Sequence, residues 1–354
     1  ASFPAIALRL RGADPELLQA SLALALARHR ELAGRIRGTA VELSDEGVPF
    51  AVVESSLPSA PTPIREPDLL RFADFRRAIR VSAGLEPPMT VRLTRFRDGS
   101  AVLAICRSHV LMDGTSAWAF IGDWARAARG EEMIAGRASG LEEGLPGRAE
   151  VDALFVERFG EPLRARFAST KMALVRSIMR VAGPPVDLLF LTGSTADLER
   201  PRVFFSDADI AALKAAATPS TPGSWVSTQE AIAAYLVLTV GRALLPASSK
   251  GRVAIAYILD PRKAIGRSAT ETFGCGLAVV SLTFEGLLQL SLPEIAGKLH
   301  EAAQTEMSLK EAGQRWRMMG GCVKDGIEFA LMNKIMPKKW EYDVALTLNN
   351  QSKR

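Results

Sequence analysis

The sequence predicts an α/β protein built on mixed sheets. In both halves of the chain, short apolar stretches typical of strands alternate with capped segments typical of helices. The second half thus repeats the mixture found in the first. The 354 residues also exceed the size, roughly 250–300 residues, at which a single hydrophobic core stops growing. We therefore expect two domains, or one large one.

The composition excludes several classes of protein. A hydrophobic fraction of 48% and a charged fraction of 23% are typical of globular domains and exclude disorder, collagen and coiled coil. No apolar stretch reaches the roughly 20 residues that a membrane-spanning helix needs. The net charge of +5 favours an anionic ligand such as a nucleotide phosphate. The basic residues are scattered and no aromatic–basic stripe occurs, so the sequence does not indicate a nucleic-acid partner.

The three cysteines, Cys106, Cys275 and Cys322, show neither the spacing of metal ligands nor an even disulfide framework. Three reduced thiols fit a reducing compartment or a protein that needs no disulfides, and we expect a cytoplasmic protein. The chain starts at Ala1 rather than Met. The alternative is therefore a plastid or another organelle, with a leader removed from the protein. No signal-peptide pattern is visible.

The first half is predicted to alternate between strands and helices. A strand from Phe3 to Leu10 precedes a helix with Asp14 as N-cap and Pro15 at its first position, which ends near His29. Three further apolar segments predict strands, and the turn Arg97-Asp98-Gly99-Ser100 joins the last two. These strands cover 50–53, 89–96 and 101–107, and a helix covers 116–130.

The stretch 130–202 is rich in glycine and proline, which predicts a long connection with one or two helices and a domain boundary. Beyond it, Ser206, Ser227 and Ser291 each precede an acidic residue by three positions. This spacing is typical of a helix start closed by a capping box. Apolar segments predict strands over 203–205, 252–259 and 276–284.

Of the three histidines, His109 is the candidate for chemistry. His29 and His300 are expected to be solvated or partly packed structural residues, because charged neighbours flank both. His109 ends an apolar strand and precedes a turn with Asp113 and Gly114, and a strand end that opens into a helix projects its last side chain into a crevice. We expect Gly114 to let the backbone turn back at a point where a Cβ would clash. On spacing alone, a packed core histidine remains the favoured interpretation.

Other catalytic arrangements do not fit the sequence. It contains no GxSxG elbow, P-loop, GxGxxG fingerprint, HExxH or CxxC. Ser108 and Cys106 would face the opposite side of an extended strand from His109. Cys275 could approach a site, but a small packed thiol is the favoured interpretation.

Several segments resemble the BAHD acyltransferases, a family of CoA-dependent transferases in plants and fungi. His109-Val110-Leu111-Met112-Asp113-Gly114 is similar to the HxxxDG motif of that family. Further segments agree with the family in order and spacing over nearly the whole chain except its middle. These segments are 21–35, 94–126, the helix start 226–231, Asp260-Pro261-Arg262 followed by Phe273-Gly274, and 347–353.

The resemblance implies two similar chloramphenicol-acetyltransferase-like domains, with mixed sheets flanked by helices and a channel between them. The related condensation domains share this architecture. The N-terminal domain, residues 1–150, would carry HxxxDG. Residues 151–202 would form the crossover connection, and 203–354 the C-terminal domain.

The resemblance also implies roles for individual residues. His109 would be the general base, acting in a ternary complex of acyl-CoA and acceptor, and Gly114 would complete its motif. Asp113 would point away from the channel and hold the loop by pairing with Arg262. Chemically this fits, because a neutral imidazole with a pKa near ~6.5 can take a proton from a hydroxyl or amine at neutral pH.

The implied partners are acyl-CoA, as cosubstrate, and a small-molecule acceptor with a hydroxyl or amine, with no other cofactor and no metal. The resemblance places the donor at Lys214 and at the helix start of Ser227 and Thr228, where free N–H groups can face phosphates. A solvated surface lysine is the alternative role for Lys214. We expect a monomer without a transmembrane segment.

Some features depart from the family. The closing DFGWG motif does not occur, because the chain stops at Arg354 before it. The Asn that follows Phe-Gly in the family is not kept. Ser108 stands where condensation domains usually have a second histidine. The two ends of the chain leave open an alternative, a non-catalytic scaffold or assembly subunit that retains the fold, although the intact set of His109, Asp113 and Gly114 argues against it.

Overall fold

The computed structural model contains two compact units, and each is described by itself. Described residues up to 134, together with 272–274, belong to the first unit, and those in 204–262 and 278–349 to the second. The structure describes residues 4–37, 40–44, 46–64, 66–75, 81, 84–109, 111–134, 153, 156, 204–245, 251–260, 262, 272–274, 278–306 and 343–349.

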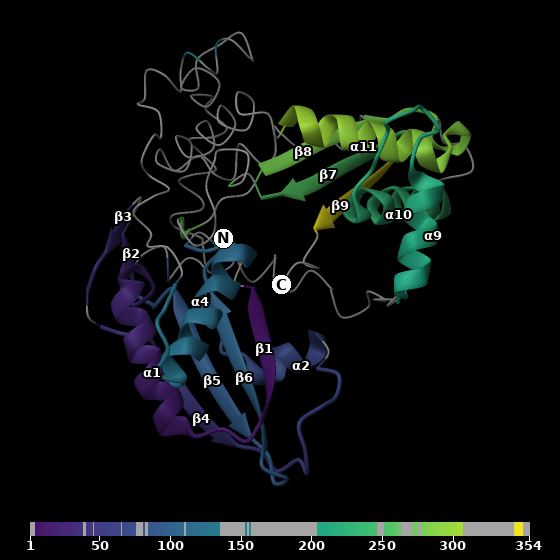
Figure 1. Ribbon diagram of the computed structural model, residues 1–354. Helices are drawn as coiled ribbons and strands as arrows, with labels where there is room; N and C mark the ends of the chain where they lie inside the picture. Colours follow the sequence, from purple (N-terminus) through teal and green to yellow (C-terminus); the bar gives the residue numbers. More distant parts are fainter. Residues whose placement is uncertain are drawn as a thin grey trace. The chain divides into compact units, whose positions relative to one another are not determined.

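A mixed four-stranded sheet forms the centre of the described part of the first unit (Figure 1). The elements of this unit are β1 (Ala5–Arg11), α1 (Pro15–Arg28), the 3-10 helix η1 (Arg30–Leu32), β2 (Arg35–Arg37), β3 (Ala40–Glu42), β4 (Phe50–Glu54), α2 (Glu66–Phe72), β5 (Met89–Arg95), β6 (Ser100–Arg107) and α4 (Gly114–Ala128). The strand order is β1-β6-β5-β4. β6 is antiparallel to both of its neighbours, whereas β4 and β5 are parallel.

The two faces of this sheet are covered by different helices. Along β6, Ala101, Leu103 and Ile105 face the core formed with α1 and α4. Val102 and Ala104 face a smaller core with Phe72, at the end of α2. Side chains alternate between the faces of a strand, so β6 must be apolar throughout if both faces are covered.

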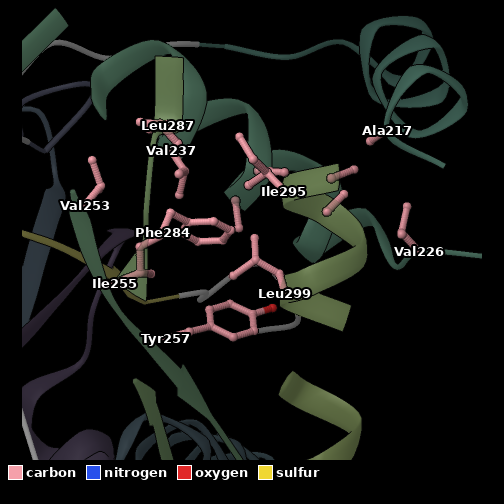
Figure 2. Packing of buried hydrophobic residues seen from close by; sticks show 14 of the residues in the cluster. Ala217, Val226, Val237, Val253, Ile255, Tyr257, Phe284, Leu287, Ile295 and Leu299 are labelled. Carbon is pink, nitrogen blue, oxygen red and sulfur yellow. The ribbon is translucent and has the colours of Figure 1, made fainter. Parts of the chain in front are cut away.

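The described part of the second unit contains a three-stranded sheet in the order β8-β7-β9. Its elements are α9 (Asp207–Ala217), α10 (Thr228–Leu244), β7 (Val253–Leu259), β8 (Ala278–Phe284), the 3-10 helix η3 (Leu287–Gln289), α11 (Leu292–Glu306) and β9 (Val344–Asn349). β7 is antiparallel to β8 and parallel to β9, so this sheet is mixed as well. Figure 2 shows its core, in which Tyr257, Phe284 and Leu299 are almost fully buried.

These sheets confirm the predicted α/β class with mixed sheets. The predicted strands near 50–53, 252–259 and 276–284 correspond to β4, β7 and β8. The strand predicted over 203–205 is wrong for the described residues, because Phe204 and Phe205 form no strand and Phe204 is exposed. No pattern in the sequence predicted β2, β3 or α2. Most of the connection predicted over 130–202 lies outside the described residues.

The predicted domain boundaries and the channel between the halves stay predictions. Within the part of the chain that the structure describes, no helix is both long enough and apolar enough to cross a bilayer.

We predict that Gly34→Ala destabilises the first unit. A Cβ at position 34 would overlap the backbone carbonyl oxygen of Glu42 in β3, so the strand pair would have to move. We expect the free energy of unfolding to fall by about 1–3 kcal/mol in urea titrations, as for other overpacked sites. Gly122→Ala is the matched control. No atom lies within 4 Å of a Cβ at that position in α4, so this change should stabilise the protein by about 0.5–1 kcal/mol. Equal effects of the two changes would contradict the prediction.

Candidate functional site

The connection between β6 and α4 carries the candidate catalytic residues. β6 ends at Arg107 and α4 begins at Gly114, so His109 lies just past the strand end, as predicted. The N–H of Ser108 donates to the carbonyl of Pro88 at 2.7 Å, and that of Leu111 donates to the carbonyl of Ser108 at 3.3 Å. The turn is thereby held on both sides of His109. The His109 side chain is half-buried, whereas Ser108 is fully buried.

Asp113 is buried and is the N-cap of α4. Its Oδ1 accepts a hydrogen bond from the N–H of Ser116 at 2.8 Å, and its backbone is extended, with φ −78° and ψ −171°. A carboxylate in this position accepts a hydrogen bond from a free helix N–H and interacts favourably with the positive end of the helix dipole. The helix therefore begins at Gly114 rather than at the predicted residue 116.

Gly114 begins α4, and its predicted role in avoiding a Cβ clash stays a prediction. It is the first helical residue and is buried, but it is not among the glycines with positive φ. The turn therefore does not depend on a left-handed conformation at this position.

Two further side chains hold the connection in place. Nη2 of Arg107 donates to the carbonyl of Asp113 at 3.3 Å, and Nη1 donates to the carbonyl of Pro4 at 3.4 Å. The hydroxyl of Ser116 donates to the carbonyl of Gly274 at 2.7 Å and accepts from the N–H of Gly274 at 3.0 Å. The same carbonyl accepts from the N–H of Asp113 at 3.3 Å. Gly274, from late in the chain, is thus hydrogen-bonded to the start of α4.

His29 is part of the support for this segment, and the expectation of a solvated or partly packed residue is wrong. Its side chain is fully buried, its Nε2 lies 3.3 Å from Oδ2 of the buried Asp123, and its ring packs on Phe273 with centroids 4.3 Å apart. Asp123 also accepts from the N–H of Ile134 at 2.7 Å. The flanking arginines suggested exposure, but a histidine with a buried carboxylate partner can be part of the core.

In the second unit, the start of α10 contains the predicted donor-binding residues. Ser227 is the N-cap: its hydroxyl accepts from the N–H of Glu230 at 3.2 Å, and its N–H donates to Oε2 of Glu230 at 2.6 Å. The predicted capping box is therefore present. The buried Glu230 carboxylate also lies 3.1 Å from Nδ1 of His300, whose ring makes an edge contact with Trp225 at 4.5 Å.

Tyr257 lies on β7 near this carboxylate. Burial raises the pKa of its phenol, and the negative charge of Glu230 raises that pKa further, whereas a hydrogen bond with Gln229 lowers it. The folded protein therefore keeps Tyr257 neutral at a pH at which an exposed tyrosine would ionise.

The remaining predicted residues have these surroundings. Thr228 and Lys214 are exposed on α10 and on the last turn of α9. Arg262 is almost fully buried, and its Nη1 contacts both carboxylate oxygens of Asp260 at 3.1 Å. Arg262 and Asp113 belong to different units, and their pairing stays a prediction.

Two of the three cysteines, Cys275 and Cys322, lie outside the described residues. No group of three potential metal ligands occurs among the residues that the structure describes.

Comparison with known proteins finds a family model that covers this segment. The model of the Transferase family matches residues 11–159, which include the junction of β6 and α4. Over 128 residues, the chain is 27% identical to omega-hydroxypalmitate O-feruloyl transferase of Arabidopsis thaliana, covering 32% of this chain and 27% of that protein. Over 116 residues, it is 27% identical to BAHD acyltransferase DCR of the same species, covering 32% and 24%.

The predicted resemblance to BAHD acyltransferases is confirmed by these relatives, although the chain matches only about a quarter of their length. The fold extends further than the sequence match. The crystal structure of F. sporotrichioides TRI101, complexed with coenzyme A and T-2, aligns with 98% of this chain and 79% of that one. The TM-score is 0.58 and the sequence identity 16%, so the two proteins share a fold.

We predict that Ser116→Ala loosens the contact between α4 and Gly274. The change removes a hydroxyl that both donates to and accepts from the Gly274 backbone, so the free energy of unfolding should fall by about 1–3 kcal/mol. Urea titration followed by circular dichroism measures the change. The control is Ser220→Ala, an exposed serine of the second unit, for which we expect about 0.5 kcal/mol at most. A Ser116→Ala protein as stable as the control would show that this contact is dispensable.

The raised pKa of Tyr257 predicts a loss of stability in alkali. Below pH 10.0, the ordinary pKa of the phenol, the group is neutral in both states. Above it, the unfolded state releases a proton that the folded state retains, so stability falls as pH rises. Tyr257→Phe should show a shallower fall than the parent protein above that pH, measured as melting temperature against pH. Parallel curves for the two proteins would refute the role assigned to Tyr257.

Proposed function

We propose that the protein is an acyl-CoA-dependent O- or N-acyltransferase in which His109 is the general base of a ternary complex. The observation that carries the proposal is the placement of His109. The half-buried ring lies between a strand end and a capped helix start, within the part of the chain that the Transferase family model matches. CoA in the complexed structure of TRI101, a protein with the same fold, supports the choice of donor.

In the proposed reaction, a ring nitrogen of His109 takes the proton of the acceptor hydroxyl or amine as the acceptor attacks the thioester carbonyl. A carbon–oxygen or carbon–nitrogen bond forms, and the oxyanion of the tetrahedral intermediate collapses. The carbon–sulfur bond then breaks, and the proton on His109 passes to the CoA thiolate. General-base catalysis of this kind contributes about 10²–10⁴-fold to the rate.

This mechanism needs no acyl-enzyme. Cys106, the described cysteine nearest in sequence to His109, is buried within β6 with 1% of its surface exposed. A buried thiol in an apolar strand has little thiolate character, so it is a poor nucleophile. The residues therefore support direct transfer between two bound substrates.

The donor residues of the proposal are Lys214, Ser227 and Thr228 in the second unit. Thr228 and Lys214 are exposed, so both can reach a ligand in solvent. The Glu230 carboxylate at the start of α10 sets a limit on this role, because a negative charge there opposes the phosphates of CoA. We therefore assign the pantetheine, rather than a phosphate, to the helix start, and propose that Lys214 meets a phosphate as a point charge.

Replacing His109 tests the proposal. We expect His109→Ala to lower kcat by about 10²–10⁴-fold with a panel of acyl-CoA donors and hydroxyl or amine acceptors. The affinity for acyl-CoA, measured by calorimetry, should change little, because the ring contacts the acceptor proton. Cys106→Ser is the control and should retain substantial activity.

Three results would overturn parts of the proposal. Full activity of His109→Ala would exclude His109 as the base. An acylated cysteine, found by mass spectrometry after incubation with donor alone, would replace direct transfer by a covalent mechanism. The non-catalytic scaffold would be favoured if the protein turned over no donor and acceptor of a broad panel but still bound its partner proteins.

A further inference from the structure

A hollow in the first unit, away from the His109 segment in sequence, is lined by positive and hydroxyl side chains. It has a volume of about 270 Å³ and lies where the end of α2 meets the β4–β5 edge of the sheet. Its described lining residues are Val53, Glu54, Ser55, Ser56, Leu57, Arg71, Phe72, Arg92 and Thr94. Alternation along β5 puts Arg92 and Thr94 on the face opposite Leu93, which belongs to the α1 and α4 core.

Two residues that line this hollow each have a buried polar atom without a hydrogen-bond partner. The atoms are Nε of Arg92 and Oγ1 of Thr94, and the Thr94 residue is only 3% exposed. Thr90, two positions earlier on the same face of β5, donates its hydroxyl to the carbonyl of Asp74 at 2.6 Å. Buried hydroxyl and guanidinium groups are normally hydrogen-bonded, so two unpaired donors on residues that line one hollow point to a missing acceptor.

The charges around the hollow favour an anion. Arg71 and Arg92 both line it. The acidic lining residue, Glu54, pairs with Arg95, with Oε1 3.2 Å from Nη1. The Ser55 hydroxyl accepts from the N–H of Leu57 at 3.2 Å and can still donate its own proton. Arg71 and Arg92 thus remain as positive charges that Glu54 does not neutralise, and hydroxyl donors line the same hollow.

We propose that this hollow is a binding site for a phosphate group, either inorganic phosphate or the phosphate of a small monoester. Arginine recognises phosphate through several parallel N–H donors, and the Thr94 and serine hydroxyls supply donors from other directions. An anion with several acceptor oxygens matches this set better than a carboxylate does. The site is independent of the proposed acyl transfer, because none of its residues belongs to the His109 or α10 segments.

Thr94→Val separates binding from folding. Valine keeps the shape of threonine and removes the unpaired hydroxyl, so without phosphate this variant should melt at the same or a higher temperature than the parent. Calorimetric titration with inorganic phosphate, at constant ionic strength with chloride as the balancing anion, should show saturable binding by the parent. In Thr94→Val and Arg92→Gln, phosphate affinity should fall by about 10-fold or more, as for other lost hydrogen bonds to a charged group.

Arg97→Gln is the matched control. Arg97 is an exposed arginine just after β5 that does not line the hollow, so its replacement removes one positive charge and should leave phosphate affinity within about 2-fold. A second titration with glycerol 3-phosphate, and with glycerol as its blank, distinguishes the two sources. Tighter binding than inorganic phosphate identifies a monoester, and equal or weaker binding identifies free phosphate.

Two outcomes would overturn the proposal. The first is no saturable phosphate binding by the parent protein. The second is the same phosphate affinity in the parent, Thr94→Val and Arg92→Gln, because binding that does not depend on these donors must occur elsewhere on the protein.

Discussion

The hydrogen bond from the N–H of Ser116 to the buried Asp113 carboxylate fixes the point at which β6 turns into α4. A carboxylate that is almost fully buried must be satisfied by donors, and the first turn of a helix presents such donors in a fixed direction. Asp113 therefore cannot move without unwinding the helix start. His109 lies only four residues before this anchor and two after the end of β6, so the freedom of its backbone is restricted on both sides.

A second constraint comes from far along the chain. Ser116 and Gly274 are 158 positions apart, yet the hydroxyl of one exchanges two hydrogen bonds with the backbone of the other. Phe273, next to Gly274, packs on His29, which in turn meets Asp123 of α4. The first unit thus includes a segment from late in the chain, 272–274, which packs against α4 and its start. Local sequence alone cannot position the motif, because part of its support arrives only when this segment docks.

The elements that local rules describe are the ones that could be predicted from the sequence. Asp14 with Pro15 marks the start of α1, and Ser227 with Glu230 marks the start of α10, because capping depends on residues only two or three positions apart. The buried state of His29 could not be predicted, because its partner Asp123 is 94 positions away. α2 was missed for a related reason. It spans only seven residues, and Phe72 at its end is held by packing against the sheet.

The distribution of carboxylates explains why the arginine-lined hollow, rather than a helix start, suits a phosphate. In the second unit, α9, α10 and α11 each begin with a serine and an acidic residue joined by hydrogen bonds: Ser206 with Asp209, Ser227 with Glu230, and Ser291 with Glu294. In the described part of the chain, each of these positive helix ends already has its own anion, which stabilises the helix and repels another. The bonds from Ser206 and Ser291 also lower the pKa of Asp209 and Glu294, so these two caps keep their charge in mildly acidic solution.

The hollow lined by Arg71 and Arg92 has no carboxylate of this kind available to its arginines among its described lining residues, because Glu54 is paired with Arg95. An anion there gains charge-assisted hydrogen bonds without displacing a carboxylate, and it provides the acceptor that the buried Arg92 and Thr94 donors lack.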